Sequence, residues 1–223
     1  MIDRQAWQKL VEELGSSGTA LVAVSKSKPV EDVKALYELG QRDFGENYVQ
    51  ELVSKQAELP PDIRWHFIGH LQRNKVRAIA PFVSLIHAVD SFRLLLEINK
   101  EAAAANRCID ILLQMHIAEE PSKFGLDEKG IIELLEYYDA QRAAIQNIRI
   151  CGLMGMSTAT EDEGLVRQEF RRLHGLFLNL KASSFLTSSY FNICSMGMSG
   201  DYRIAVSEGS NMVRIGSLLF GSR

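Results

Sequence analysis

Lys26 is the first residue of this chain whose type and position point to chemistry. It follows the apolar run 20–24, which is typical of a buried strand, and it stands in the loop opened by Ser25. Burying an ammonium group is costly, so lysine is rarely buried without a reason. One such reason is nucleophilic attack on an aldehyde by a desolvated lysine. The alternative is that Lys26 is simply the first solvated residue after the strand, and this segment leaves both interpretations open.

A second group of candidate residues lies near the C-terminus. Ser195, Gly197, Ser199 and Gly200 follow an apolar run, and Arg214 and Gly216 end another. Glycines allow a close backbone approach and serine hydroxyls donate to phosphate oxygens. A tight turn with a helix N-cap explains the same residues. The segment alone therefore indicates either a phosphate site or a turn.

Short apolar runs and helical periods alternate along the chain. The expected strands are 19–25, 43–46, 64–68, 85–89, 109–117, 148–154, 190–194 and 212–216. The expected helices are 3–14, 30–40, 48–58, 71–80, 91–105, 127–141, 161–181 and 201–209, with Asp90–Ser91 as a candidate N-cap. Strands that alternate with helices favour parallel pairing through right-handed crossovers.

Eight strand–helix units predict a (β/α)₈ TIM barrel with an extra N-terminal helix. The length of 223 residues falls within the usual range of this fold. A doubly wound open sheet is the structural alternative. The sequence has no linker or low-complexity tract, so residues 1–223 are expected to form a single domain.

In such a barrel the active site lies in the loops after the strands, and the last two loops commonly bind phosphate. Lys26 would then lie at the mouth, across from a phosphate site made by the loops of Ser195–Gly200 and Gly216. This layout is expected for pyridoxal 5′-phosphate (PLP), held by a lysine Schiff base and by its phosphate. Arg214 would lie under the pyridine ring. An arginine there keeps its proton, which makes the ring a weaker electron sink.

Seven segments, spread in order over nearly the whole chain, closely resemble the pyridoxal-phosphate homeostasis protein family. That family is a single-domain relative of the alanine racemase N-terminal barrel (fold-type III). The similar segments are 23–29 (AVSKSKP), 43–51 (DFGENYVQE), 65–75 (WHFIGHLQRNK), 123–125 (KFG), 152–154 (GLM), 195–201 (SMGMSGD) and 213–223, which includes VRIG.

The resemblance implies specific cofactor contacts. It places the PLP Schiff base on Lys26 rather than on Lys28. It also implies Asn47 beside the ring, Arg214 toward the pyridine nitrogen, and a set of residues around the phosphate. That set is Ser195, Ser199 and Gly216. We expect no dedicated catalytic residue and no metal ligand, and His66 and His70 are interpreted as structural histidines.

The expected function is to hold PLP and to act in its intracellular homeostasis, buffering or supplying this form of vitamin B6 and influencing amino- and keto-acid balance. Recipients would be PLP-dependent apo-enzymes. The alternative is an alanine-racemase-like PLP-dependent isomerase. By resemblance, that chemistry needs a tyrosine from a further C-terminal domain, and the sequence ends at Arg223 after its eighth strand. A site open to water also loses the low dielectric that favours proton transfer. We therefore expect little or no catalysis.

Composition limits the partners and the compartment. A net charge of −3 gives no electrostatic case for nucleic acid or an anionic membrane. The three cysteines form no CxxC pair, and the N-terminus lacks the pattern of a signal peptide. We expect a cytoplasmic protein, without a membrane span, that is a monomer or a weak dimer.

Overall fold

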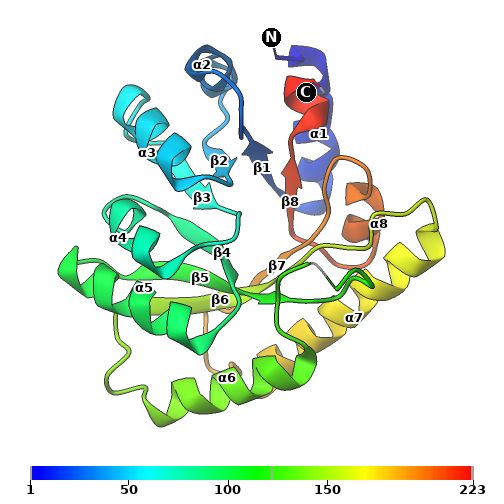
Figure 1. The fold of residues 1–223 in the computed structure, drawn as a ribbon. Coiled ribbons are helices and arrows are strands. Elements are labelled where there is room, and N and C mark those ends of the chain that lie inside the picture. The colour runs from blue at the N-terminus through cyan, green and yellow to red at the C-terminus, as the bar shows by residue number, and fades with distance from the viewer. Residues whose placement is uncertain (1, 122, 222–223) are drawn as a thin grey trace.

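Within the described residues, eight parallel strands form one closed barrel in the order β1-β2-β3-β4-β5-β6-β7-β8 (Figure 1). The computed structural model describes residues 2–121 and 123–221. The strands are β1 Ala20–Val24, β2 Asp43–Glu46, β3 Arg64–Phe67, β4 Leu85–Val89, β5 Ile109–Met115, β6 Ile148–Gly155, β7 Ile193–Ser195 and β8 Met212–Ile215. Pairing of β1 with β8 closes the sheet, so the barrel is confirmed and the open-sheet alternative is wrong.

Helices surround the barrel as predicted, except that two of them differ from the prediction and one strand begins later than predicted. They are α1 Arg4–Ser17, α2 Val30–Glu38, α3 Val49–Glu58, η1 Arg73–Lys75 (a 3₁₀ turn), α4 Val76–Ile79, α5 Phe92–Ala104, α6 Glu128–Ala140, α7 Glu163–Ala182, α8 Tyr202–Ser207 and α9 Ser217–Phe220. The helix expected over 71–80 is thus two short turns, and α9 was not predicted. The strand expected over 190–194 begins only at Ile193, because Phe191 instead packs against Phe185 at 4.0 Å between ring centroids.

The extra N-terminal helix expected from the sequence is α1. Asp3 caps it by accepting from the Ala6 backbone N–H, and Gly18 ends it in a left-handed conformation with φ 66°. Leu10 and Leu14 are buried on its inner face. Its start lies beside the end of the chain (Figure 1), where the backbone N–H of Asp3 donates to Leu219 O.

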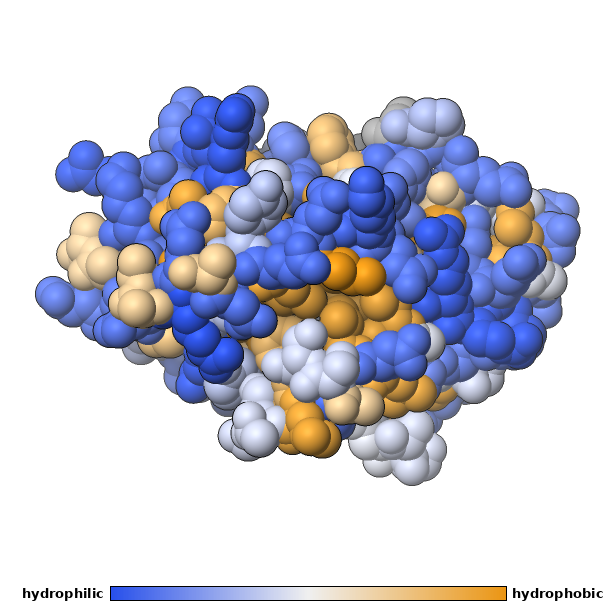
Figure 2. Space-filling view, turned by 90° about the horizontal axis from the view of Figure 1, so that it is seen from below, coloured by the Kyte–Doolittle hydropathy of each residue, from blue (hydrophilic) through white to orange (hydrophobic). Residues whose placement is uncertain are grey.

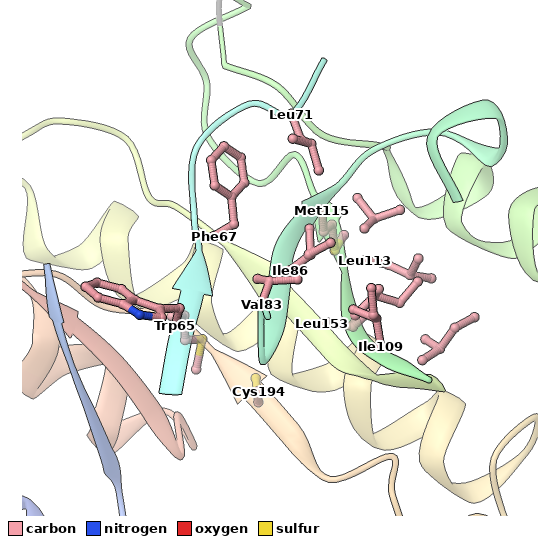
Figure 3. Close-up of a cluster of buried hydrophobic side chains, with 14 of the residues drawn as sticks. Trp65, Phe67, Leu71, Val83, Ile86, Ile109, Leu113, Met115, Leu153 and Cys194 are labelled. Atoms are coloured by element: carbon pink, nitrogen blue, oxygen red, sulfur yellow. The ribbon is translucent and has the colours of Figure 1, made fainter. Parts of the chain in front are cut away.

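Two layers of buried side chains stabilise the barrel. The larger layer lies between the strands and the surrounding helices, and Figure 3 shows Trp65, Phe67, Ile86, Leu113 and other members of it converging there. The smaller layer forms a separate cluster and includes Val22, Leu85, Leu112, Met154 and Met212. Residues two apart on a strand share a face. Arg214 therefore shares the face of Met212, with the smaller cluster inside the barrel.

The register of the strands places the candidate residues at one end of the barrel. Val24 pairs with Gly45, and Ala23 pairs with Ile215. Lys26, two residues after Val24, therefore lies at the height of Asn47, two residues after Gly45. Gly216 follows β8 at the same edge. The carboxyl ends of the strands thus gather the residues that the sequence singled out.

The lower face of the molecule in Figure 1, where α6 and α7 lie, has an apolar hollow within a hydrophilic surface (Figure 2). A groove there is lined by both helices, with Ile132 and Leu135 from α6 and Leu176 and Leu180 from α7. None of the helices in the described residues has the length and apolar character needed to span a membrane.

Candidate functional site

Lys26 lies half-buried in the loop after β1, where its amine has no partner among the described residues. Its Nζ makes no hydrogen bond or ion pair with any residue in the described ranges. Lys28, by contrast, donates from Nζ to the carbonyls of Phe220 at 3.0 Å and Gly221 at 3.1 Å. Of these two lysines, only Lys26 therefore has an amine that can react without breaking a contact.

A buried cluster below this loop holds it in place. Lys55 Nζ donates at 2.7 Å to three oxygens, namely Ser25 O, Glu46 Oε1 and Glu51 Oε1. Ser25 Oγ donates to the same Glu46 oxygen, and the Ser27 backbone N–H donates to Glu51 at 2.6 Å. Burial raises the pKa of Glu46 by more than the hydrogen bonds from Lys55 and Ser25 lower it. The cluster fixes the backbone on both sides of Lys26.

Sequence reasoning did not find this cluster. Glu51 and Lys55 have the i, i+4 spacing of a helical ion pair, and that spacing was the available signal. It indicated a surface pair, whereas Lys55 is 3% exposed and Glu46 is fully buried.

Asn47 lies at the neighbouring strand end with an unsatisfied polar atom. Its Oδ1 is buried and has no hydrogen-bond partner among the described residues. Gly69, after β3, packs directly on it, since a Cβ at Gly69 would lie 2.3 Å from Asn47 O. Buried polar atoms are normally paired, so a missing partner needs an explanation, such as a ligand.

The loops after β7 and β8 meet, as predicted. The Gly216 backbone N–H donates to Ser199 Oγ at 3.3 Å, and the Arg214 backbone N–H donates to Gly197 O at 3.0 Å. Gly197 has φ 99°, and a Cβ there would lie 2.6 Å from the Ala205 Cβ. Only glycine allows this close approach of loop and α8.

Arg214 projects into the barrel interior from β8 and is 4% exposed. Its NH1 donates to Ser195 O at 2.9 Å and Ser195 Oγ at 2.7 Å, and its NH2 donates to Gly155 O at 2.9 Å. Burial lowers its pKa to about 10, so it remains protonated at neutral pH. Its hydrogen-bond acceptors are neutral, and the charge of Asp201 partly opposes the effect of burial on its pKa.

Two further predictions concern polar residues near the site, and one concerns metal ligands. The Ser195 hydroxyl lies between Arg214 and His87, so its contact with a phosphate stays a prediction. Of the candidate pair Asp90–Ser91, Ser91 caps α5, whereas Asp90 Oδ2 lies 3.4 Å from His70 Nδ1. The described residues contain no group of three His, Cys, Asp or Glu placed to hold a metal ion.

These residues fit PLP. Lys26 offers an unpaired amine for an aldehyde, Asn47 offers an orphaned polar side chain, and Arg214 offers a fixed cation to an aromatic ring nitrogen. The loops of Ser199 and Gly216 are joined by the hydrogen bond from the Gly216 N–H to Ser199 Oγ, which leaves the Ser199 hydroxyl proton for a phosphate.

Comparison with known proteins agrees with this interpretation. Residues 3–223 match the family model described as "Alanine racemase, N-terminal domain". A "Pyridoxal phosphate homeostasis protein" of Pasteurella multocida is 37% identical over 215 residues, covering 93% of this chain and 88% of the relative. A relative with the same name from Synechocystis is 34% identical over 225 residues, and the match covers 100% of both proteins.

Solved structures give the same result. PipY of Synechococcus elongatus without PLP has a TM-score of 0.88 at 33% identity, covering 97% of this chain and 99% of that one. PipY with PLP bound has a TM-score of 0.84 at 32% identity, with the same coverage. An alanine racemase from Streptomyces lavendulae has a TM-score of 0.77 at 19% identity, and 58% of it is covered. That last likeness concerns the fold alone.

Proposed function

This chain belongs to the pyridoxal phosphate homeostasis protein family, whose barrel is that of the alanine racemase N-terminal domain, and we propose that it holds PLP on Lys26. It binds PLP and acts in the homeostasis of that cofactor. The observation that carries the assignment to Lys26 is its unpaired amine at the mouth of the barrel, beside a lysine that is committed elsewhere.

The proposal assigns a role to each of the six residues that the sequence predicted to contact the cofactor. Lys26 condenses with the PLP aldehyde and releases one water, forming the Schiff base. Asn47 supplies a polar contact beside the ring, and Arg214 donates toward the pyridine nitrogen. Ser199 donates its hydroxyl proton to the phosphate, and the Gly216 N–H orients that hydroxyl by donating to its oxygen. Ser195 contributes through the Arg214 guanidinium that it contacts.

The same geometry favours binding over turnover. When bound, PLP supplies an electron sink whose strength depends on protonation of the ring nitrogen. Arg214 keeps its own proton at neutral pH, so the nitrogen it faces accepts a hydrogen bond and stays unprotonated. We propose that residues 1–223 act as one PLP-binding domain that serves PLP-dependent apo-enzymes. The site needs no residue of a second copy, so we propose a monomer or weak dimer, in the cytoplasm.

The test compares two lysine variants. Purified protein is titrated with PLP, and its absorption spectrum is recorded for the wild type, Lys26→Ala and Lys28→Ala. We expect a shifted, protein-bound chromophore in the wild type and in Lys28→Ala, and only free PLP absorption in Lys26→Ala. An unchanged spectrum in Lys26→Ala would contradict the proposal.

A second measurement addresses turnover. The PLP-loaded protein is incubated with alanine in deuterium oxide, and exchange at Cα is followed by NMR. Cofactor holding predicts exchange no faster than with free PLP. Sustained exchange that depends on the protein would instead establish the racemase alternative.

A further inference from the structure

A line of polar side chains crosses the barrel interior below the proposed PLP site. Arg214 NH1 lies 2.7 Å from Ser195 Oγ, which lies 3.2 Å from His87 Nδ1. His87 Nε2 then lies 2.9 Å from His66 Nδ1, and His66 Nε2 lies 3.1 Å from Asp43 Oδ1. The line therefore runs without a break from Arg214 to the start of β2.

This line is buried among apolar side chains. His87 and Ser195 are fully buried, and His66 is 4% exposed. Their neighbours in the interior belong to the cluster of Val22, Leu85, Leu112 and Met154. Unpaired polar groups in such surroundings are costly, so each atom of the line needs its partner. Burial, together with the charge of Arg214, holds the pKa of His87 well below its usual range, so His87 is neutral.

The two ends of the line have fixed roles. Arg214 can only donate a hydrogen bond. At the other end, burial raises the pKa of Asp43, but hydrogen bonds from Arg64 and His66 outweigh it and lower the pKa to about 2. Asp43 is therefore an ionised acceptor. Arg64 already pairs with both of its oxygens at 2.6 Å, so its charge is balanced without a charged histidine.

With these ends, two neutral histidines allow one arrangement of protons. Arg214 donates to Ser195 Oγ, the Ser195 hydroxyl donates to His87 Nδ1, His87 donates from Nε2 to His66, and His66 donates from Nε2 to Asp43. Each contact of the line then has one donor and one acceptor. If His66 carried a charge, the direction between the histidines would reverse. The Ser195 hydroxyl proton would then have no acceptor among the contacts of the described residues.

We propose that Asp43, His66 and His87 are positioning residues for the cofactor-facing Arg214, because their one-way chain commits the Ser195 proton to His87 and leaves its oxygen to accept from Arg214. This inference rests on the proposed PLP site. It assigns Ser195 to the orientation of the guanidinium and leaves the phosphate to the joined loops of Ser199 and Gly216.

The first test needs no cofactor. Protein labelled with ¹⁵N-histidine is studied by NMR at neutral pH, and the tautomers are read from long-range ¹H–¹⁵N couplings. The signals are assigned with the variants His66→Gln and His87→Asn. The expected result is a neutral ring with the proton on Nε2 for both residues. A charged His66, or His87 with its proton on Nδ1, overturns the proposal.

The second test uses two substitutions at one position. His87→Asn keeps an oxygen near the place of Nδ1, so the Ser195 hydroxyl retains an acceptor. His87→Leu has a similar volume and provides none. We expect PLP affinity about tenfold weaker, with a shifted absorption maximum, in His87→Leu, and affinity within about threefold of the wild type in His87→Asn. His174→Leu, which changes a histidine on α7 outside the interior, is the control for the substitution itself and leaves binding unchanged.

The outcomes separate the two proposals. A loss in His87→Asn as large as that in His87→Leu would mean that an acceptor for the Ser195 hydroxyl does not matter, and would overturn the positioning role. If the wild type takes up no PLP, the proposed function fails. The histidine tautomers still decide whether the line of hydrogen bonds from Arg214 to Asp43 runs in the proposed direction. Circular dichroism verifies the fold of each variant, and if His87→Leu does not fold, the tautomers and His87→Asn remain as the test.

Discussion

Replacing Lys55 by methionine tests whether the buried cluster supports the Lys26 loop. Methionine has a similar length and removes all three hydrogen bonds of 2.7 Å from Nζ. Glu46 is fully buried and would lose its counter-charge. Removing one partner of a buried ion pair costs about 3–5 kcal/mol, and we expect the free energy of unfolding at neutral pH to fall by about this amount.

The loss of stability in Lys55→Met depends on pH, and the raised pKa of Glu46 determines whether it grows or shrinks as the pH falls. The folded-state pKa of Glu46 is already raised by burial above its ordinary value of 4.5, and removal of Lys55 raises it further. A group of this kind contributes stability that is fully present below the unfolded pKa and is lost as pH rises through the folded pKa. The variant therefore loses less relative to the wild type at pH 5 than at pH 7.5, because Glu46 is then partly protonated.

The assay is urea unfolding of both proteins at the two pH values, with Lys129→Met as the matched control. Lys129 is 83% exposed and lies 3.4 Å from Glu133, so its loss is worth at most about 0.5 kcal/mol. Lys55→Met should also weaken PLP binding, because the carbonyl of Ser25 loses its donor. A deficit below about 1 kcal/mol at pH 7.5, or one that grows as the pH falls, would refute the reasoning.

Two glycines on opposite sides of the barrel give further predictions. Gly69→Ala brings a Cβ to 2.3 Å from Asn47 O, so Asn47 must move, and we expect PLP affinity to fall about tenfold by spectroscopic titration; an unchanged affinity would mean that Asn47 does not contact the cofactor. Gly175→Ala on α7 meets no atom within 4 Å, so helix propensity should raise stability by about 1 kcal/mol in urea unfolding, and a loss of stability would be inconsistent with the open space at this position.

The barrel was predictable because its strands and helices alternate at short range. Each element could be recognised from its own residues, and the closing pair of β1 and β8 followed from the number of units. The shift of β7 to Ile193 was not predictable, since it depends on where Phe191 stacks.

The site was predictable only in part, for a similar reason. Lys26 and Arg214 stand at strand ends, which local patterns reveal. His87 and Lys55 act through contacts with residues 21 and 30 positions away. Such pairs arise from strand register and helix packing, which no local pattern encodes. His66 was identified as a structural histidine, but its partners on both sides became visible only in the barrel.

The most direct test of the central claim is the position of covalent attachment. The protein is loaded with PLP, reduced with borohydride and digested, and the modified peptide is mapped by mass spectrometry. We predict a single reduced phosphopyridoxyl group on Lys26, and an unmodified Lys28, whose amine is held by the carbonyls of Phe220 and Gly221. Modification at Lys28 in place of Lys26, or no modification of either lysine, would contradict the account.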